Sequence, residues 1–295
     1  MNMEIKKTIT IGETTKYPLT ILRLGYGTMQ LTGDYVWGEP KNRREALQIL
    51  KSAIANGIKF LDTADYYGED VTNRLIFEAL FPYPDDLVVC TKVGVTRKPD
   101  KSWRTFDKPE NLRKSIDKNL KTLKREQIQL VHFRVMPGTA TPLEESLDAL
   151  FAIQREGKIL HVGVSNVSAE ELEKAMTIGR IASVENAFGY GQRTSFKKYN
   201  SDYRGMQEVM SICEKNGIPM IPFWSLQNSF HKNDDKISVM ANKYHATPAQ
   251  INLAWLLHYN QLLLPIPGTS KLEHFEENIR AIDISLTAED MKWLG

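Results

Sequence analysis

Residues 42–62 read NRREALQILKSAIANGIKFLD, a helical pattern followed directly by a short apolar stretch. The apolar residues that share one helix face are Ala46, Ile49, Leu50 and Ala53. Their spacing predicts an α-helix between Asn42 and Asn56. The segment Ile58–Asp62 follows Gly57, and its length and apolar character are typical of a buried strand. A helix that leads into a strand is the repeating unit of α/β proteins.

The same alternation returns along the chain and predicts eight strands separated by helices. The first strand ends at Leu24, and the others are Ile58–Asp62, Leu87–Thr91, Ile128–Phe133, Ile159–Val164, Ala182–Val184, Ile218–Phe223 and Leu262–Ile266. Among the helices between them, one starts at Pro142, and Ser168 with Glu171 forms a capping box for another. The later helical patterns are Met206–Cys213, Ile237–Tyr244, Pro248–Leu257 and a last one with Leu272, Phe275 and Ile279.

Regular alternation implies parallel strands, because a parallel connection needs a dozen or more residues. Eight such units can close into an (α/β)8 TIM barrel, which is the fold that we predict. An open doubly wound sheet is the alternative. No linker rich in Pro, Gly or Ser divides the chain, so residues 1–295 are expected to form one domain. The alternating residues Thr8–Ile11 and Thr20–Ile21 predict a β-hairpin that caps one end of the barrel.

The composition narrows the class of protein. There are 38 Lys and Arg against 36 Asp and Glu, and 42% of the residues are hydrophobic. These values exclude an intrinsically disordered chain and lack the basic excess of a nucleic-acid binder. Cys90 and Cys213 are too few for a disulfide framework, and they form no metal-ligand pair. Neither a signal peptide nor a run of about 18 apolar residues is found, so we expect a cytoplasmic protein without a membrane span.

Polar residues at the carboxyl ends of the strands are the candidates for chemistry, because active sites of such barrels form there. Asp62, Tyr67, Lys92 and His132 all fall at this rim. Together they can transfer a proton to a carbonyl oxygen. A tyrosine has a pKa of about 10, which a neighbouring ammonium lowers. A carboxylate can hold that ammonium in place, and a histidine can donate a hydrogen bond to the same oxygen.

Several stretches of the sequence resemble the signature blocks of aldo-keto reductases. These stretches are GYGTM (Gly25–Met29), FLDTADYYG (Phe60–Gly68), TKVG (Thr91–Gly94), GVSN (Gly163–Asn166) and PIPGTSKLEHFEEN (Pro265–Asn278). They follow the family's order over nearly the whole chain. The chain is most similar to bacterial members with GYGxMQL, PYPDDL and RVM blocks, here Gly25–Leu31, Pro82–Leu87 and Arg134–Met136.

The resemblance implies an (α/β)8 barrel that reduces aldehydes or ketones with a nicotinamide cofactor. It implies a catalytic tetrad of Asp62, Tyr67, Lys92 and His132. Tyr67 would be the general acid, with a pKa lowered by Lys92, which Asp62 holds. His132 would orient the substrate carbonyl. Hydride would pass from nicotinamide C4 to the carbonyl carbon.

The resemblance also implies the residues that hold the cofactor, without a Gly-x-Gly-x-x-Gly fingerprint. They are Gly27, Thr28, Met29, Asp62, Ser165, Asn166, Glu185, Phe223, Trp224, Ser225, Leu226, Gly268, Thr269, Ser270, Lys271, His274, Glu277 and Asn278. Ser165 and Asn166 would hold the carboxamide, and Phe223 would stack on the nicotinamide. Glu185 departs from the Gln that the family has there, and a carboxylate accepts but does not donate hydrogen bonds.

The 2′-phosphate of NADPH would lie at the start of the last helix. We expect Gly268 to Lys271 to open that helix, whose N-terminal N–H groups and dipole favour a phosphate. Lys271 and two hydroxyls would add to this. His274 stands where the family often has Arg, a better phosphate partner. The expectation is therefore a preference for NADPH over NADH.

The loops over the rim should select the substrate. Trp37, Tyr66 and Trp103 are the candidate walls, and broad activity on small or aromatic aldehydes, pyridoxal among them, is expected. Two other functions stay open. A cofactor-sensing regulatory subunit of the same fold would bind cofactor without turnover, and an isomerase or aldolase would use Lys92 as a Schiff-base amine.

Overall fold

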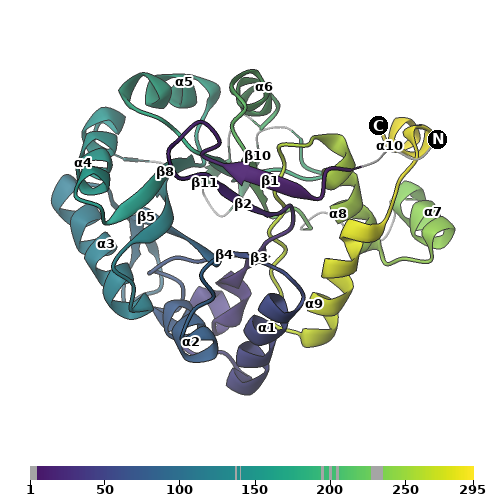
Figure 1. The fold of residues 1–295 in the computed structure, drawn as a ribbon, viewed down its shortest axis with the longest axis horizontal. Helices are drawn as coiled ribbons and strands as arrows, with labels where there is room; N and C mark the ends of the chain where they lie inside the picture. The colour runs from purple at the N-terminus through teal and green to yellow at the C-terminus, as the bar shows by residue number, and fades with distance from the viewer. Residues whose placement is uncertain are drawn as a thin grey trace.

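Parallel strands form the centre of the molecule, and helices surround them (Figure 1). The structure is a computed structural model that describes residues 5–136, 138–139, 141–193, 196–198, 201–203, 206–226 and 235–295. The parallel sheet consists, in spatial order, of β3 (Tyr26–Gly27), β4 (Phe60–Asp62), β5 (Val88–Arg97), β7 (Ile128–Arg134), β8 (Ile159–Ser165), β9 (Val184–Ala187) and β12 (Met220–Phe223). Chain order and spatial order agree, as expected of consecutive right-handed strand–helix units.

The segment 262–267 joins the two edges of this sheet. On one side, the Leu264 N–H donates to the Met220 carbonyl of β12 at 2.9 Å. On the other side, the Gly25 N–H donates to the Pro265 carbonyl at 2.8 Å, next to β3. Both edges are therefore paired, which fits an (α/β)8 barrel and excludes the open doubly wound sheet.

The first strand of the barrel differs from the sequence prediction. It was expected to end at Leu24, but β3 begins only at Tyr26. The apolar residues before Leu24 belong instead to β2 (Leu19–Leu22), which pairs with β1 (Thr8–Ile11) in the predicted antiparallel hairpin. Alternation of side chains marks a strand, but it does not tell which neighbour the strand pairs with.

The hairpin closes the barrel at the end where the strands begin, and in Figure 1 it crosses the middle of the ring. Its buried residues Ile9, Ile11 and Ile21 pack against inward-facing residues such as Phe60 and Val88, which stand at the starts of β4 and β5. Apolar side chains therefore fill this end of the barrel, and the polar site can form only at the other end.

The helices cover the outside of the sheet. They are α1 (Arg43–Ala55), α2 (Val71–Leu80), α3 (Pro109–Leu123), α4 (Leu143–Arg155), α5 (Ala169–Ile178), α6 (Met206–Asn216), α7 (Asp235–Tyr244), α8 (Pro248–Tyr259), α9 (Leu272–Ile279) and α10 (Ala288–Leu294), with short 3-10 turns η1 (Thr28–Leu31), η2 (Asp34–Val36) and η3 (Arg280–Asp283). The predicted capping box of Ser168 and Glu171 is confirmed at α5, and Pro142 directly precedes α4. Among these described helices, none combines the length and the apolar character that a bilayer crossing requires.

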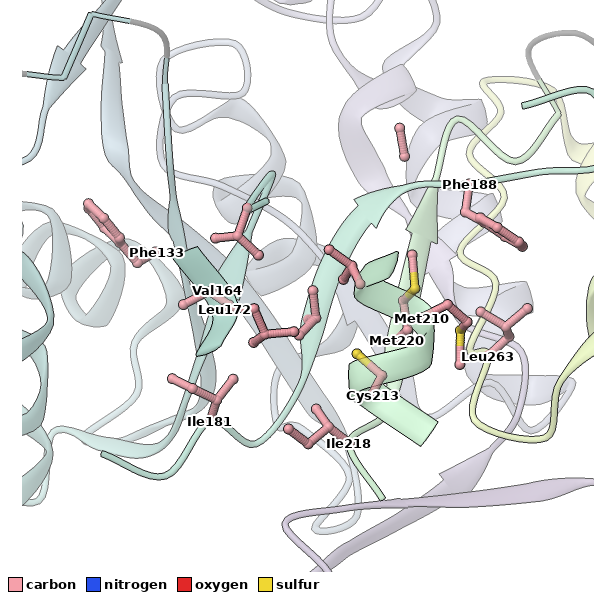
Figure 2. Packing of buried hydrophobic residues seen from close by; sticks show 14 of the residues in the cluster. Phe133, Val164, Leu172, Ile181, Phe188, Met210, Cys213, Ile218, Met220 and Leu263 are labelled. Carbon is pink, nitrogen blue, oxygen red and sulfur yellow. The ribbon is translucent and has the colours of Figure 1, made fainter. Parts of the chain in front are cut away.

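The outer core lies between strands and helices (Figure 2). Leu172 of α5 and Met210 and Cys213 of α6 are buried with Val164 of β8 and Met220 of β12. Burial of each large apolar side chain stabilises the fold by roughly 1.5–3 kcal/mol. Because side chains cover both faces of the sheet, most residues of its strands are apolar.

Two antiparallel hairpins complete the described fold. β6 (Trp103–Phe106) turns back on the end of β5, and β10 (Phe196–Lys198) pairs with β11 (Ser201–Tyr203). The β5–β6 hairpin extends β5 beyond the barrel rim, so Trp103 comes to lie beside the loop that follows β4.

Candidate active site

Lys92 and Asp62 form a buried ion pair at the rim of the barrel. Asp62 ends β4, Lys92 lies on the neighbouring β5 two residues after Cys90, the register partner of Asp62, and Lys92 Nζ is 2.5 Å from each Asp62 carboxylate oxygen. The two side chains are about 5% exposed or less. Burial and the charge of Glu185 raise the pKa of Asp62 to about 7, while Lys92 opposes this shift. Lys92 is thus fixed by a carboxylate, as expected.

Tyr67 lies above this ion pair, in the loop after β4. Lys92 Nζ is 5.1 Å from the centroid of the Tyr67 ring, so its positive charge lies beside the phenol. The loop needs Gly68, which has φ +66° and whose added Cβ would lie 2.8 Å from the Gly38 carbonyl oxygen. Tyr67 is buried, and it is brought together with Asp62 and Lys92.

The electrostatics of Tyr67 favour the neutral phenol. Burial raises its pKa well above the usual value, and the nearby Lys92 ammonium offsets only part of that shift. Burial alone would lower the pKa of Lys92, but Asp62 and Glu185 hold it well above its usual value. At neutral pH the site therefore contains a phenol with a proton to give and an ammonium beside it.

Glu185 of β9 lies beneath the ion pair. Its Oε1 is 3.3 Å from Lys92 Nζ, and its Oε2 is 2.9 Å from His132 Nδ1. Lys92 therefore stands between two carboxylates. Glu185 is one of the residues expected to contact the cofactor; its carboxylate is 1% exposed and also contacts Lys92 and His132.

His132 is fully buried, and both of its ring nitrogens have close partners. Nδ1 faces Glu185, and Nε2 is 2.8 Å from Ser183 Oγ. Nδ1 also lies 3.2 Å from Cys90 Sγ, with which it shares a hydrogen bond. Burial lowers the pKa of His132, which keeps the ring neutral. In this arrangement the Ser183 hydroxyl occupies Nε2, the nitrogen that would have to meet a substrate oxygen.

A group of potential metal ligands lies at the same depth. Cys90, His132 and Glu185 are all buried, and their ligand atoms lie within 4.8 Å of one another. The ammonium of Lys92 already provides a positive charge next to the Glu185 carboxylate. Within the group, Cys90 Sγ lies 3.2 Å from His132 Nδ1, while Glu185 Oε2 makes no hydrogen bond to a residue that the structure describes.

Two of the expected cofactor positions carry strained backbone. Asn166 directly follows β8 and has φ +60°, and Trp224 directly follows β12 and has φ +56°. Non-glycine residues adopt this left-handed region at a cost, and such strain gathers at ligand-binding sites. Ser165 and Phe223 precede them, and both lie at strand ends. This observation fits a bound nicotinamide at the ends of β8 and β12. Ser225 and Leu226 continue the chain after Trp224.

The expected substrate walls form one aromatic surface. The Tyr66 ring lies 5.3 Å from Tyr67 and 5.7 Å from Trp103, both edge to face. The guanidinium of Arg97 is 4.1 Å from the Trp103 ring and 5.5 Å from the Trp37 ring. Tyr66 and Trp103 are therefore brought together next to Tyr67, and Trp37 joins them through Arg97.

The comparisons with known proteins agree with this geometry. The sequence model of the Aldo/keto reductase family matches residues 23–294. The chain belongs to the aldo/keto reductase family. It is also 36% identical over 292 residues to pyridoxine 4-dehydrogenase of Escherichia coli strain K12, with 97% of this chain and 96% of that protein covered. The protein is therefore an NAD(P)H-dependent oxidoreductase.

Solved structures give the same family fold. The reductase is similar to a thermostable aldo-keto reductase, Tm1743, solved with the inhibitor epalrestat, with a TM-score of 0.80 and 28% identity over 99% of this chain and 98% of that one. An aldo/keto reductase from Klebsiella pneumoniae, solved with NADP and acetate, has a TM-score of 0.77 at 22% identity over 98% and 94% of the two chains. At that identity the second likeness concerns the fold alone.

Gly27 and Gly268 hold the two edges of the reductase barrel together. A Cβ on Gly27 would lie 2.8 Å from the Ile266 carbonyl oxygen, and one on Gly268 would lie 2.7 Å from the Gly27 carbonyl oxygen. Thr28, on the same side, donates from its hydroxyl to the Asp62 carbonyl at 2.9 Å. Met29 packs near Tyr66 and Tyr67. The early glycine block thus has a packing role beside any contact with cofactor.

The start of α9 differs from the expectation. Residues 268–271 were expected to open it, but α9 begins at Leu272 and Lys271 is its N-cap. Thr269 and Ser270 lie outside the helix because the Thr269 hydroxyl accepts from the Lys271 N–H and forms a turn. On α9, His274 is exposed, Asn278 is buried, and the Glu277 carbonyl accepts from Gln250.

Arg134 lies next to the candidate site, although in the sequence it stands out only as the first residue of the RVM stretch. Its Nη1 donates to Ser165 Oγ at 3.1 Å, and its guanidinium lies 4.9 Å above the Phe223 ring. The signal was present in the sequence. Residues two apart on a strand share a face, so Arg134 lies on the same side of β7 as His132.

Proposed function

We propose that this aldo/keto reductase reduces aldehydes and ketones to alcohols, with Tyr67 as the general acid. The observation that carries the proposal is the position of Lys92, whose ammonium is fixed by Asp62 and lies 5.1 Å from the centroid of the Tyr67 ring. The ammonium stabilises the phenolate that proton transfer leaves behind, so it makes the buried phenol a better acid.

In the proposed reaction the bound cofactor would supply the hydride to the carbonyl carbon. Tyr67 gives its hydroxyl proton to the carbonyl oxygen, so the C=O group becomes CH–OH. The charge on Tyr67 is then stabilised by Lys92 until solvent returns a proton. Low exposure of Tyr67, at 7%, and of Lys92, at 4%, keeps water from competing for these interactions.

We also propose that His132 completes the tetrad. To donate to a substrate oxygen, its Nε2 must exchange Ser183 for the substrate and carry a proton. The contact of Nδ1 with Glu185 supports that proton, because a carboxylate stabilises the imidazolium. Glu185 thus connects His132 to Lys92 in one network.

The proposed cofactor site includes the strained residues Asn166 and Trp224, which follow β8 and β12. Ser165 and Asn166 would hold the carboxamide, Phe223 would stack on the nicotinamide, and residues 224–226 would follow the pyrophosphate. Gly27, Thr28, Met29 and Asp62 would line the path, and Glu185 would lie beneath it. At the far end, Gly268, Thr269, Ser270, Lys271, His274, Glu277 and Asn278 would contact the adenosine moiety and its 2′-phosphate. NADPH is the proposed cofactor in preference to NADH, because Lys271 supplies a cation at that end.

For the substrate we propose aromatic aldehydes, which the surface of Trp37, Tyr66 and Trp103 fits by stacking. Pyridoxal is one such substrate, and the similarity to a pyridoxine 4-dehydrogenase over nearly the whole chain supports it. The pyridine ring would lie against the aromatic surface with its aldehyde toward Tyr67. The active unit is proposed to be one domain that spans residues 1–295.

The test is a screen of aldehydes, including pyridoxal, that follows NADPH absorbance for the wild type and for Tyr67→Phe. We expect turnover with aromatic aldehydes, and a loss of at least about a hundredfold in Tyr67→Phe, in the range of general acid catalysis. NADPH affinity should stay within twofold. Binding of NADPH without turnover of any carbonyl would instead establish the cofactor-sensing alternative.

A further inference from the structure

A carboxylate from another helix lies at the N-terminus of α9. Glu45 is in the first turn of α1, and α1 and α9 lie side by side (Figure 1). The Leu272 N–H, the first of α9, donates to Glu45 Oε1 at 3.2 Å. Glu45 Oε2 is 3.5 Å from Lys271 Nζ. The helix end that would attract a phosphate is thus already in contact with an internal anion.

The position of Glu45 is fixed by its own helix. Asn42 caps α1 by accepting from the Glu45 N–H, and the Asn42 side-chain amide donates to Glu45 Oε2 at 3.1 Å. The Leu272 N–H and then Lys271 hold the pKa of Glu45 below its usual value, so the group is charged at neutral pH. The carboxylate therefore has three partners, the Asn42 amide, the Leu272 N–H and the Lys271 ammonium, which together orient it toward α9.

A 2′-phosphate bound by Lys271 would meet this carboxylate. Both anions need the same ammonium and the same helix end, and like charges a few Å apart repel each other. The phosphate must therefore either displace Glu45 or bind beside it at reduced strength. The 2′-hydroxyl of NADH carries no charge, and it meets no such repulsion.

We propose that Glu45 is a specificity-determining residue for the cofactor, which weakens binding of the 2′-phosphorylated dinucleotide and leaves NADH unaffected. The proposal rests on the cofactor site described under the proposed function. The preference of the reductase for NADPH over NADH should consequently be smaller than it would be with Lys271 and without the charge of Glu45.

The experiment measures dissociation constants for NADPH and NADH by quenching of tryptophan fluorescence, in the wild type and in Glu45→Gln. Gln keeps an oxygen that accepts from Leu272, so the fold is expected to persist. NADPH binding should tighten about tenfold, as one removed charge near a phosphate predicts, while NADH binding stays within twofold. The same contrast is expected for the fragments 2′,5′-ADP and 5′-AMP, which test the adenosine end alone.

Two variants serve as controls. Glu276→Gln removes the same charge from an exposed position of α9 and should leave the NADPH to NADH ratio unchanged. Glu45→Asp keeps the charge and should keep the wild-type ratio. An unchanged ratio in Glu45→Gln, or an equal change for both dinucleotides, would overturn the inference. Absence of binding of either dinucleotide to the wild type would overturn the proposed function, which is a different result.

Discussion

Glu185 Oε2 lies 2.9 Å from His132 Nδ1, and through its other oxygen Glu185 also contacts Lys92. One carboxylate therefore acts on two members of the proposed tetrad. It lies against the imidazole of His132, and its charge raises the pKa of both Lys92 and Tyr67.

Glu185→Gln should shift the pH dependence of carbonyl reduction. Reduction needs protonated Tyr67, so kcat/KM falls as pH rises through its pKa. Glu185 raises that pKa, so its neutralisation lowers it, and the falling limb should move to lower pH by about one unit. The pH profile of kcat/KM checks this. Glu185→Asp keeps the charge, so the falling limb of its pH profile should stay at the wild-type pH. A falling limb that does not move in Glu185→Gln would contradict the effect of Glu185 on the pKa of Tyr67.

Lys92→Met should destabilise the fold as well as stop turnover. The change leaves Asp62 and Glu185 buried without their shared cation, which is expected to cost about 3–5 kcal/mol of unfolding free energy. The double variant Asp62→Asn with Lys92→Met should recover part of that loss because one uncompensated charge is gone. Urea denaturation measures both. Equal stability of the single and double variants would show that the Asp62 charge is not the cause.

The raised pKa of the buried Asp65 carboxyl predicts that the unfolding free energy depends on pH. Burial raises its pKa from the usual 3.8 to about 7, so the folded state binds a proton that the unfolded state releases. The unfolding free energy should therefore fall as pH rises from 4 to 7, by up to about 4 kcal/mol from this group. Asp65→Asn should remove this part of the slope and be the more stable protein at pH 8. Parallel slopes of the two proteins in denaturation from pH 4 to 8 would refute the assignment.

Trp103→Ala should alter substrate choice. The variant removes the ring that lies 5.7 Å from Tyr66 and stacks on Arg97. KM for aromatic aldehydes should rise about tenfold, in the range of one lost aromatic contact, while KM for a small aliphatic aldehyde changes less than twofold. Tyr35→Ala is a control, because Tyr35 is 81% exposed. An equal rise for both aldehydes would mean that Trp103 supports the loop and not the substrate.

Much of the fold could be predicted from local pattern. The helix after Asn42 and the capping box at Ser168 are set by residues within one turn of each other, and both are found. The strand at Tyr26–Gly27 was misplaced because it has only two residues. Its pairing depends on the distant segment 262–267, which no periodicity of the nearby sequence reveals.

The site could be predicted less completely than the fold. Tyr67, Lys92 and Asp62 were found because motif and strand end coincide. The contacts of Glu185 with Lys92 and His132 could not be predicted from the sequence. They depend on the pairing of β9 with β8, which sets where the Glu185 carboxylate lies. Glu45 gave no signal at all, because its contact with Leu272 depends on how α1 and α9 pack.

The pairing of segment 262–267 with both β3 and β12 has a consequence for how the molecule forms. A ribosome-bound chain that has not yet exposed this segment holds two unpaired sheet edges, and such edges attract other chains. The barrel can close only after segment 262–267 has been synthesised, and this closure brings Gly27 and Gly268 into contact. A nascent chain therefore completes its barrel and loses its exposed sheet edges in the same step, when segment 262–267 pairs with β3 and β12.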